Sequence, residues 1–166
     1  MSGKSNYYID WRYIAGFVDG EGSFTKNGET DYRISVPQTH EGVLLAIKNF
    51  TKMGNICEPR IRKPHWKKGW TFYVAKQVDV LRFLRSVYPY LIVKKELARK
   101  LIPVIADITK RIRDRKEHLQ KITERCKFLR RKGWSYRKIG KALKIDHGYA
   151  RRIILFRSNG KEKWWA

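Results

Sequence analysis

A single carboxylate at the end of a short apolar stretch is the residue in this chain best suited to chemistry. Residues 13–24, YIAGFVDGEGSF, predict a helix that runs from about residue 10 to Gly20 and is ended by glycines. Glu21 then follows the helix end, where backbone carbonyls lack intrahelical donors and carry partial negative charge. With the Gly20 carbonyl, this carboxylate gives an all-oxygen site suited to Mg²⁺. A metal ion there could activate water and stabilise the leaving oxygen of a phosphodiester.

Three small residues in the same stretch predict a contact between two helices. Ala15, Gly16 and Gly20 carry little or no side chain, and the two glycines lie four apart on one helix face. Two such helices can approach closely, although a helix that merely tolerates glycines is the alternative. The motif occurs once in the chain, so a paired site with two acids needs two chains, and we expect a homodimer.

The composition indicates a polyanionic partner. The 166 residues include 38 Lys and Arg against 15 Asp and Glu, a net charge of +23, and 42% are hydrophobic. The apolar fraction excludes a disordered basic tail, and the charge favours phosphate backbones, because binding them releases counterions. Composition alone leaves a ribosomal or architectural protein open. No apolar run is long enough to span a membrane and no secretion signal is present, so we expect an intracellular protein, in the cytoplasm, the nucleoid or an organelle.

The apolar pattern predicts an α+β fold. After the first helix we expect a four-stranded antiparallel sheet that helices cover on one face only. The expected strands are 23–27, 32–38, 55–63 and 70–75, and the expected helices are 41–52, 77–87 and 94–106.

The uncovered face of this sheet is expected to bind the nucleic acid. Alternation along each strand separates a polar set from an apolar set. The polar set is Thr25, Asn27, Arg33, Ser35, Arg60, Arg62, Thr71 and Tyr73, with Lys67 in the loop between the last two strands. The apolar set, expected beneath the helices, is Phe24, Ile34, Val36, Ile61, Phe72 and Val74. Arginines two apart on one strand suit the reading of guanine edges, whereas a solvated face is the alternative for any single residue.

Charge and a proline divide the chain. Residues 1–106 hold 18 basic and 9 acidic residues, a net of +9, and residues 107–166 hold 20 and 6, a net of +14. The change follows Pro103, where we expect the helix at 94–106 to near its end. We therefore predict a core at 1–106, a linking helix at 107–127 and a further module at 128–160.

The further module resembles a helix-turn-helix. Ser135 and Asp146 stand where the caps of its two helices are expected. The expected small core is Ile139, Ala142, Leu143, Ile145, Ala150, Ile153 and Ile154. The second helix is then expected to expose to a major groove the residues His147, Gly148, Tyr149, Arg151 and Arg152. A charged helical hairpin that packs in its own dimer is the alternative.

Residues 14–22, IAGFVDGEG, resemble the signature of the LAGLIDADG homing endonucleases, and the order of elements over residues 6–106 is similar to that family. Ala15, Gly16, Asp19 and Gly22 match the signature letter for letter. The resemblance implies an αββαββα saddle in the DNA major groove. It also implies metal-dependent cleavage across the minor groove, with two or three Mg²⁺ per dimer that Ca²⁺ or Mn²⁺ can replace in a structure. Single-motif members act as homodimers on near-palindromic double-stranded DNA.

Individual site residues follow from the same resemblance. The final acid of the signature falls on Glu21, where Asp is commoner, and Asp19 is expected to brace the turn. Gln38 resembles the glutamine that positions water near the metals. Lys94 resembles the lysine near the scissile phosphate, although Lys95 competes for that role.

Three functions fit these observations. The first is a site-specific, intron-encoded, Mg²⁺-dependent DNA homing endonuclease with Glu21, Gln38 and Lys94 as catalytic residues. The second is a non-catalytic DNA-binding regulator on the same fold, and the third is an intron RNA maturase. Retention of all three residues favours cleavage, because a protein that only binds needs no acid beside phosphates.

Overall fold

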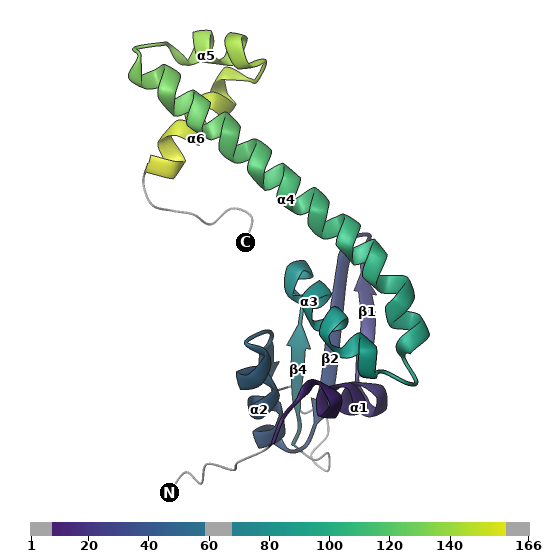
Figure 1. Cartoon of the computed structure of the whole chain (residues 1–166). Coiled ribbons are helices and arrows are strands. Elements are labelled where there is room, and N and C mark those ends of the chain that lie inside the picture. Colours follow the sequence, from purple (N-terminus) through teal and green to yellow (C-terminus); the bar gives the residue numbers. More distant parts are fainter. Residues whose placement is uncertain (1–7, 59–67, 159–166) are drawn as a thin grey trace, which may run out of the picture. The chain divides into compact units, whose positions relative to one another are not determined.

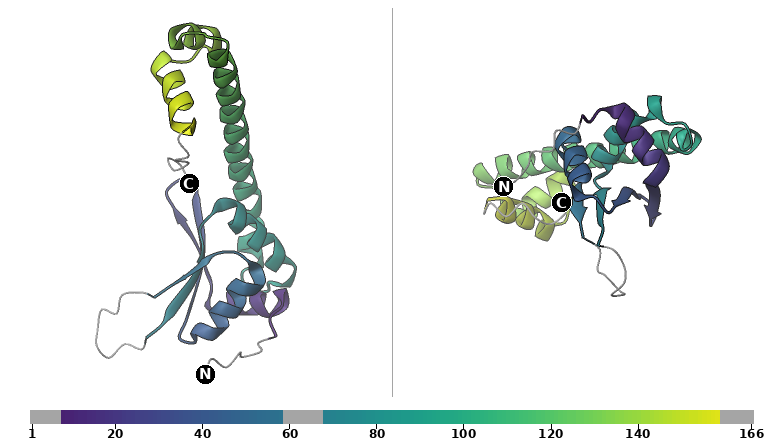
Figure 2. Two further views of the ribbon diagram at one scale, coloured as in Figure 1. Left: turned by 90° about the vertical axis from the view of Figure 1, so that its left-hand side faces the viewer. Right: turned by 90° about the horizontal axis from the view of Figure 1, so that it is seen from below.

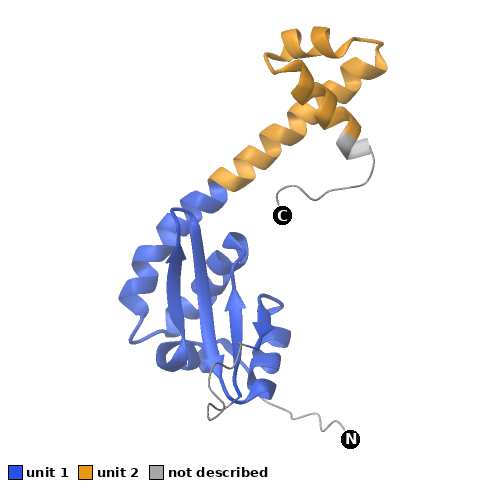
Figure 3. Ribbon diagram, turned by 180° about the vertical axis from the view of Figure 1, so that it is seen from behind, with its two compact units in different colours: residues 1–110 blue, residues 111–166 orange. Residues whose placement is uncertain are grey.

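The chain divides into two compact units, residues 1–110 and residues 111–166 (Figure 3). The structure, a computed structural model, describes residues 8–58 and 68–158, and of residues 156–158 only the backbone. Arg60, Ile61, Arg62 and Lys67, with most of the predicted strand 55–63, lie outside the described residues.

The first unit is a four-stranded antiparallel sheet with helices on one face, so the predicted α+β class is confirmed (Figure 1). The strand order is β1-β2-β4-β3. The elements are α1 (Trp11–Glu21), β1 (Ser23–Asn27), β2 (Asp31–Gln38), α2 (Glu41–Thr51), β3 (Asn55–Cys57), β4 (Trp70–Val74), α3 (Gln77–Val87), the 3₁₀ turn η1 (Tyr88–Tyr90) and the first part of α4 (Lys95–Arg131). Helices α1, α2 and α3 cover one face, whereas no described helix of the first unit lies on the other face, which is called the bare face below (Figures 2 and 3).

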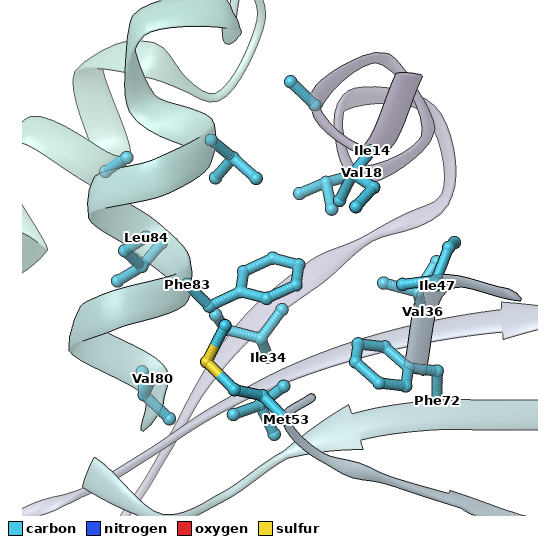
Figure 4. Packing of buried hydrophobic residues seen from close by; sticks show 14 of the residues in the cluster. Ile14, Val18, Ile34, Val36, Ile47, Met53, Phe72, Val80, Phe83 and Leu84 are labelled. Atoms are coloured by element: carbon cyan, nitrogen blue, oxygen red, sulfur yellow. The ribbon is translucent and has the colours of Figure 1, made fainter. Parts of the chain in front are cut away.

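The apolar sides of the sheet and helices form one core. Its centre is built from buried side chains of α1, β2, β4 and α3, among them Ile14, Ile34, Phe72 and Phe83 (Figure 4). Trp11 packs edge to face on Phe83, with ring centroids 5.8 Å apart. Each fully buried side chain of this kind contributes about 1.5–3 kcal/mol, so the core holds α1 and β2 in fixed positions.

Helix α4 runs for 37 residues, so the predicted end near residue 106 is wrong. Pro103 lies inside the helix with an exposed side chain, where water can reach the carbonyl that lost its donor. Ala98 and Ile105, one on each side of it, are fully buried and anchor both flanking turns. The predicted linking helix at 107–127 is therefore part of α4, and the two units divide at residue 110 and not at 106.

The second unit combines the end of α4 with α5 (Tyr136–Leu143) and α6 (His147–Ser158). Each helix contributes one residue to its fully buried centre: Cys126, Ile139 and Ala150. The predicted core residue Ala142 is exposed, because it lies on the outer side of α5, and the contribution of α4 was not predicted. Within the described parts of both units, no helix has the length and apolar character needed to cross a membrane.

Candidate active site and nucleic-acid interface

Helix α1 has a defined start and a sharp end. The Asp10 carboxylate accepts a hydrogen bond from the Tyr13 N–H at 2.7 Å, which caps the first turn. The helix ends at Glu21, one residue later than expected, and the Gly22 N–H donates to the Val18 carbonyl at 2.9 Å. A Cβ on Gly22 would lie 2.6 Å from that carbonyl oxygen, so only glycine fits where the chain turns into β1. The exposed Glu21 side chain lies at this turn.

Asp19 does not brace its own turn, which corrects the prediction. Its carboxylate accepts hydrogen bonds from three consecutive backbone N–H groups that precede α4. The donors and distances are Ile92 at 2.6 Å, Val93 at 3.2 Å and Lys94 at 2.9 Å. The carboxylate thus holds the segment that leads into α4 against the end of α1, and ties together segments more than 70 residues apart in sequence.

The same contact places Lys94. Its Nζ donates to the backbone carbonyl of Asp19, so the ammonium group lies at the C-terminal end of α1. This position is favourable for a cation, because the last helical carbonyls carry partial negative charge. Lys95 instead lies over the Tyr88 ring, 5.8 Å from its centroid. Of the two candidate lysines, the structure brings Lys94 to the helix end that carries Glu21.

The pKa of the Asp19 carboxyl group lies below its ordinary value. Partial burial would by itself raise this pKa, because it disfavours the charged form. The three backbone hydrogen bonds, and after them the positive charge of Lys94, together outweigh that effect. Asp19 is therefore a firmly ionised anchor.

Gln38 lies at the same end of the sheet as Glu21. Strands β1 and β2 are antiparallel with Ser23 opposite Ser35, so the start of β1 and the end of β2 lie at the same end of the sheet. The Gln38 side-chain oxygen accepts hydrogen bonds from the backbone N–H of Thr39 at 2.7 Å and from its hydroxyl at 3.2 Å. Gln38 and the end of α1 therefore lie at the same end of the sheet, and Lys94 is the residue that contacts α1 directly.

The candidate metal ligands at this end of the sheet suit a hard divalent cation. They are the Glu21 carboxylate and the Gly20 carbonyl, both oxygen ligands of the kind Mg²⁺ prefers. Among the residues that the structure describes, no group of three or more His, Cys, Asp or Glu could hold a metal ion. A metal bound here would therefore complete its ligands with water, with phosphate oxygens or with a second chain.

The outer face of α1 is open at its glycines. Gly16 and Gly20 are both exposed, and a Cβ on either would meet no atom within 4 Å. Beside them, the rings of Tyr13 and Phe17 stack with centroids 5.9 Å apart. Ala15 is fully buried in the core of the first unit, so its predicted place in a dimer interface is wrong.

The bare face of the sheet carries the polar set that alternation predicts, as far as the structure describes it. Thr25 lies opposite Arg33, and Ser35 lies opposite Tyr73. The register places Asn27 and Thr71 on this same face. Five further residues of this face were not predicted, although the same alternation could have identified them: Ser23, Asp31, Pro37, Asn55 and Cys57. Asp31 forms an ion pair with Arg33 at 2.9 Å, which orients that guanidinium.

The second unit has the predicted caps and turn. The Ser135 hydroxyl accepts from the Lys138 N–H at 3.3 Å, and the Asp146 carboxylate accepts from the Tyr149 N–H at 3.0 Å. Lys144 ends α5 in the left-handed conformation, with φ 53°. Of the predicted recognition residues, His147, Gly148, Arg151 and Arg152 are exposed, whereas Tyr149 is half-buried.

The comparisons with known proteins agree at the level of the fold. No protein-family model matches the chain, and no curated protein matches it. Among solved structures, it is similar to the archaeal intron-encoded homing endonuclease I-Vdi141I complexed with DNA, with 21% identity, a TM-score of 0.50 and coverage of 90% of this chain and 97% of that one. It is also similar to the meganuclease I-SmaMI bound to uncleavable DNA, with 18% identity, a TM-score of 0.50 and coverage of 64% and 40%.

The likeness to these two solved homing endonucleases is one of fold. The protein has the LAGLIDADG fold, as the resemblance of residues 14–22 predicts.

Proposed function

We propose that this protein is a site-specific double-strand DNA endonuclease that acts as a homodimer and requires a divalent cation. One observation carries the proposal: hydrogen bonds between Asp19 and Lys94 hold the lysine beside Glu21. These residues lie at the end of a helix whose outer face is open at Gly16 and Gly20. A protein that only binds DNA gains nothing from an exposed acid among its phosphate contacts. The net charge of +23 and the bare sheet face support a duplex partner.

Each residue of the site has a distinct role in this proposal. Glu21 and the Gly20 carbonyl would hold the cation, which when bound lowers the pKa of a water and stabilises the leaving oxygen of the phosphodiester. Lys94 carries a positive charge toward the scissile phosphate, and Asp19 keeps it there through the start of α4. The Gln38 amide orients the attacking water. Asp19 touches no reacting atom, so it is a positioning residue.

The homodimer follows from the count of motifs. One chain has one such helix end, whereas breaking both strands needs two. Pairing through the glycine face of α1 would place one Glu21 on each strand, and a two-fold protein reads a near-palindromic target. The sheet residues Thr25, Asn27, Arg33, Ser35, Thr71 and Tyr73 would contact the major groove, and Arg60, Arg62 and Lys67 remain predicted contacts.

The test is a cleavage selection on a randomised duplex library, with and without Mg²⁺, followed by a plasmid that carries the selected site. We expect linear plasmid only with the metal. Glu21→Gln keeps the size of the side chain and removes its charge, so cleavage should fall at least about 100-fold while binding persists. Glu117→Gln, an exposed acid on α4 paired with Arg113, is the matched control and should cut like the parent.

Equal cleavage by Glu21→Gln, with the protein folded and DNA-bound, would refute the assignment. Metal-independent binding without nicking would indicate the regulator instead. Splicing of the host intron by the Glu21→Gln variant would indicate the maturase.

A further inference from the structure

A basic groove in the second unit plays no part in the proposed nuclease. It runs between the start of α5 and one face of α6. Its lining residues are Ser135, Tyr136 and Arg137 from α5, and His147, Arg151 and Leu155 from α6. The three α6 residues are spaced four apart, so they form one stripe along that helix.

The two helices of the groove are held closely together. A Cβ on Gly140 would lie 2.8 Å from the Ile145 carbonyl oxygen and 3.2 Å from the His147 Cα. The left-handed Lys144 turns the chain between them, and the Asp146 carboxylate caps α6. These contacts fix the second half of α5 against the start of α6. This is the local geometry with which helix-turn-helix proteins present one helix to a groove of DNA.

Two arginines in the groove have no partner within the described residues. Neither Arg137 nor Arg151 forms an ion pair or lies over an aromatic ring there. Residues 107–166 hold 20 basic and 6 acidic residues, a net of +14, so the groove lies in a strongly positive unit. Unpaired guanidinium groups in such a field are suited to phosphate oxygens and guanine edges.

The aromatic rings of this unit favour a duplex over a single strand. Single-stranded nucleic acid is bound by stacking its bases on open aromatic faces. Four rings of the unit already carry a cation on one face. The pairs are Lys132 over Phe128 at 4.6 Å, Lys138 over Trp134 at 4.3 Å, Arg130 over Tyr136 at 4.5 Å and Arg152 over Tyr149 at 5.4 Å. Base stacking on those faces would have to displace these side chains.

We propose that this groove is a second binding site for double-stranded DNA, separate from the sheet. Arg137 at the start of α5 contacts the phosphate backbone, and His147 and Arg151 reach base edges in the major groove. Arg152 stays on Tyr149 and contributes less. The site extends the DNA sequence that the protein reads, and it does not depend on whether the first unit cuts.

The experiment measures binding of the full chain to a labelled mixed-sequence duplex in EDTA, where no cleavage can occur. The affinity is followed against salt concentration by fluorescence anisotropy. Arg137→Ala should reduce the slope of log K against log salt by about 0.9 for each module that touches the duplex. Arg113→Ala removes the same charge from α4, away from the groove, and should leave the slope at its parent value. Arg137→Gln serves if the alanine variant does not fold.

A binding selection in EDTA separates base reading from phosphate contact. Arg151→Ala should lower the preference for part of the selected site about tenfold or more. Arg151→Lys keeps the charge and loses the two-pronged hydrogen bonding, so it should keep the salt slope of the parent but not the preference.

Three outcomes would overturn this proposal. One is a parent-like slope for Arg137→Ala with a parent-like preference for Arg151→Ala. Another is that Arg137→Ala or Arg151→Ala loses more affinity for single-stranded RNA or DNA than for the duplex. The third is a dimer that becomes a monomer in Arg137→Ala, since the groove would then bind a second chain. A chain that never cuts but shows the expected slopes would refute the nuclease and support this site.

Discussion

Two aspartates, one in each unit, hold the backbone near the start of a helix, one by distant contacts and one by a local contact. Asp19 lies on α1 and accepts hydrogen bonds from residues 73 to 75 positions further along the chain, just before α4. Asp146 accepts from Tyr149, three positions away, and caps α6. The long-range hydrogen bonds bring Lys94 to the candidate active site, whereas the local cap only starts its own helix. The first unit thus builds its site by tertiary contacts, and the second builds its surface from adjacent residues.

The cores of the two units differ in the same sense. Within the described residues, 19 buried side chains form the cluster of the first unit and three form that of the second. One of these three is Cys126, whose pKa is raised by burial, so its thiol stays protonated and acts as a small apolar group. The stability of a unit with so small a core depends on each cap and turn, and a single substitution in one of them should have a large effect on the free energy of unfolding.

The largest effect is therefore expected from Gly140→Ala. The new Cβ would collide with the backbone of the α5–α6 turn, at 2.8 Å from the Ile145 carbonyl oxygen. Relief of that contact should destabilise the second unit by about 1–3 kcal/mol. Chemical denaturation followed by the fluorescence of Trp134, in a chain whose other tryptophans are replaced by phenylalanine, measures the change.

Lys141→Ala, the next and exposed position, is the control and should change the free energy of unfolding by at most about 0.5 kcal/mol. Equal stability of Gly140→Ala and the parent would show that the turn of the second unit is loose.

The next prediction concerns Asp19 and Asp146, and compares how the stability of each unit depends on pH. Both have a pKa below the ordinary value: Asp19 through its three backbone hydrogen bonds, which outweigh partial burial, and Asp146 first through the hydrogen bond from Tyr149. A lowered folded-state pKa stabilises the protein fully above the unfolded value of about 3.9, and the contribution is lost as pH falls through the lower folded value. Below about pH 3.9 each unit should therefore lose stability, and Asp19→Asn or Asp146→Asn should flatten that loss in its own unit only.

At neutral pH, Asp19→Ala should cost the first unit about 1.5–3 kcal/mol, the range for loss of hydrogen bonds to a charged group. It should also slow cleavage by releasing Lys94, an effect that Asp146→Ala lacks. Hydrogen exchange at the backbone amides of residues 92–94 provides the independent measurement, since these are the groups that Asp19 holds. Unchanged exchange in Asp19→Ala would contradict the anchoring role of Asp19.

The sequence predicts the features that depend on local contacts, and misses those that depend on contacts between distant residues. Caps and turns within a few residues, such as Ser135 and Asp146, were predicted because their signals are local. The alternation of β2 gave its two faces for the same reason. The partner of Asp19 was missed, because no local pattern shows that residues 92–94 return to α1. The end of α4 was misplaced because tertiary burial of Ala98 and Ile105 overrides the local preference of Pro103.

The burial of Ala15 shows a further limit of prediction from the sequence. Small residues at adjacent helix positions look alike in sequence, but only the position that faces the core is covered. Rotation of α1 buries Ala15 and exposes Gly16, and that rotation is set by where Ile14 and Val18 pack.

The smallest expected effect has the opposite sign and concerns Gly16. Its site is open, with no atom within 4 Å of an added Cβ, and alanine favours a helix more than glycine. Gly16→Ala should therefore stabilise the isolated subunit by about 0.5–1 kcal/mol, measured after dilution to the monomer, whereas the same change at Gly140 destabilises. If the α1 face pairs with a second chain, the added methyl groups should keep the helices apart, and sedimentation should show a weaker dimer. Gly28→Ala is the matched control: its site is equally open, but its φ of 72° penalises alanine, so the subunit should lose stability while the dimer persists. A Gly16→Ala variant that is stabilised and dimerises like the parent would place the dimer interface elsewhere.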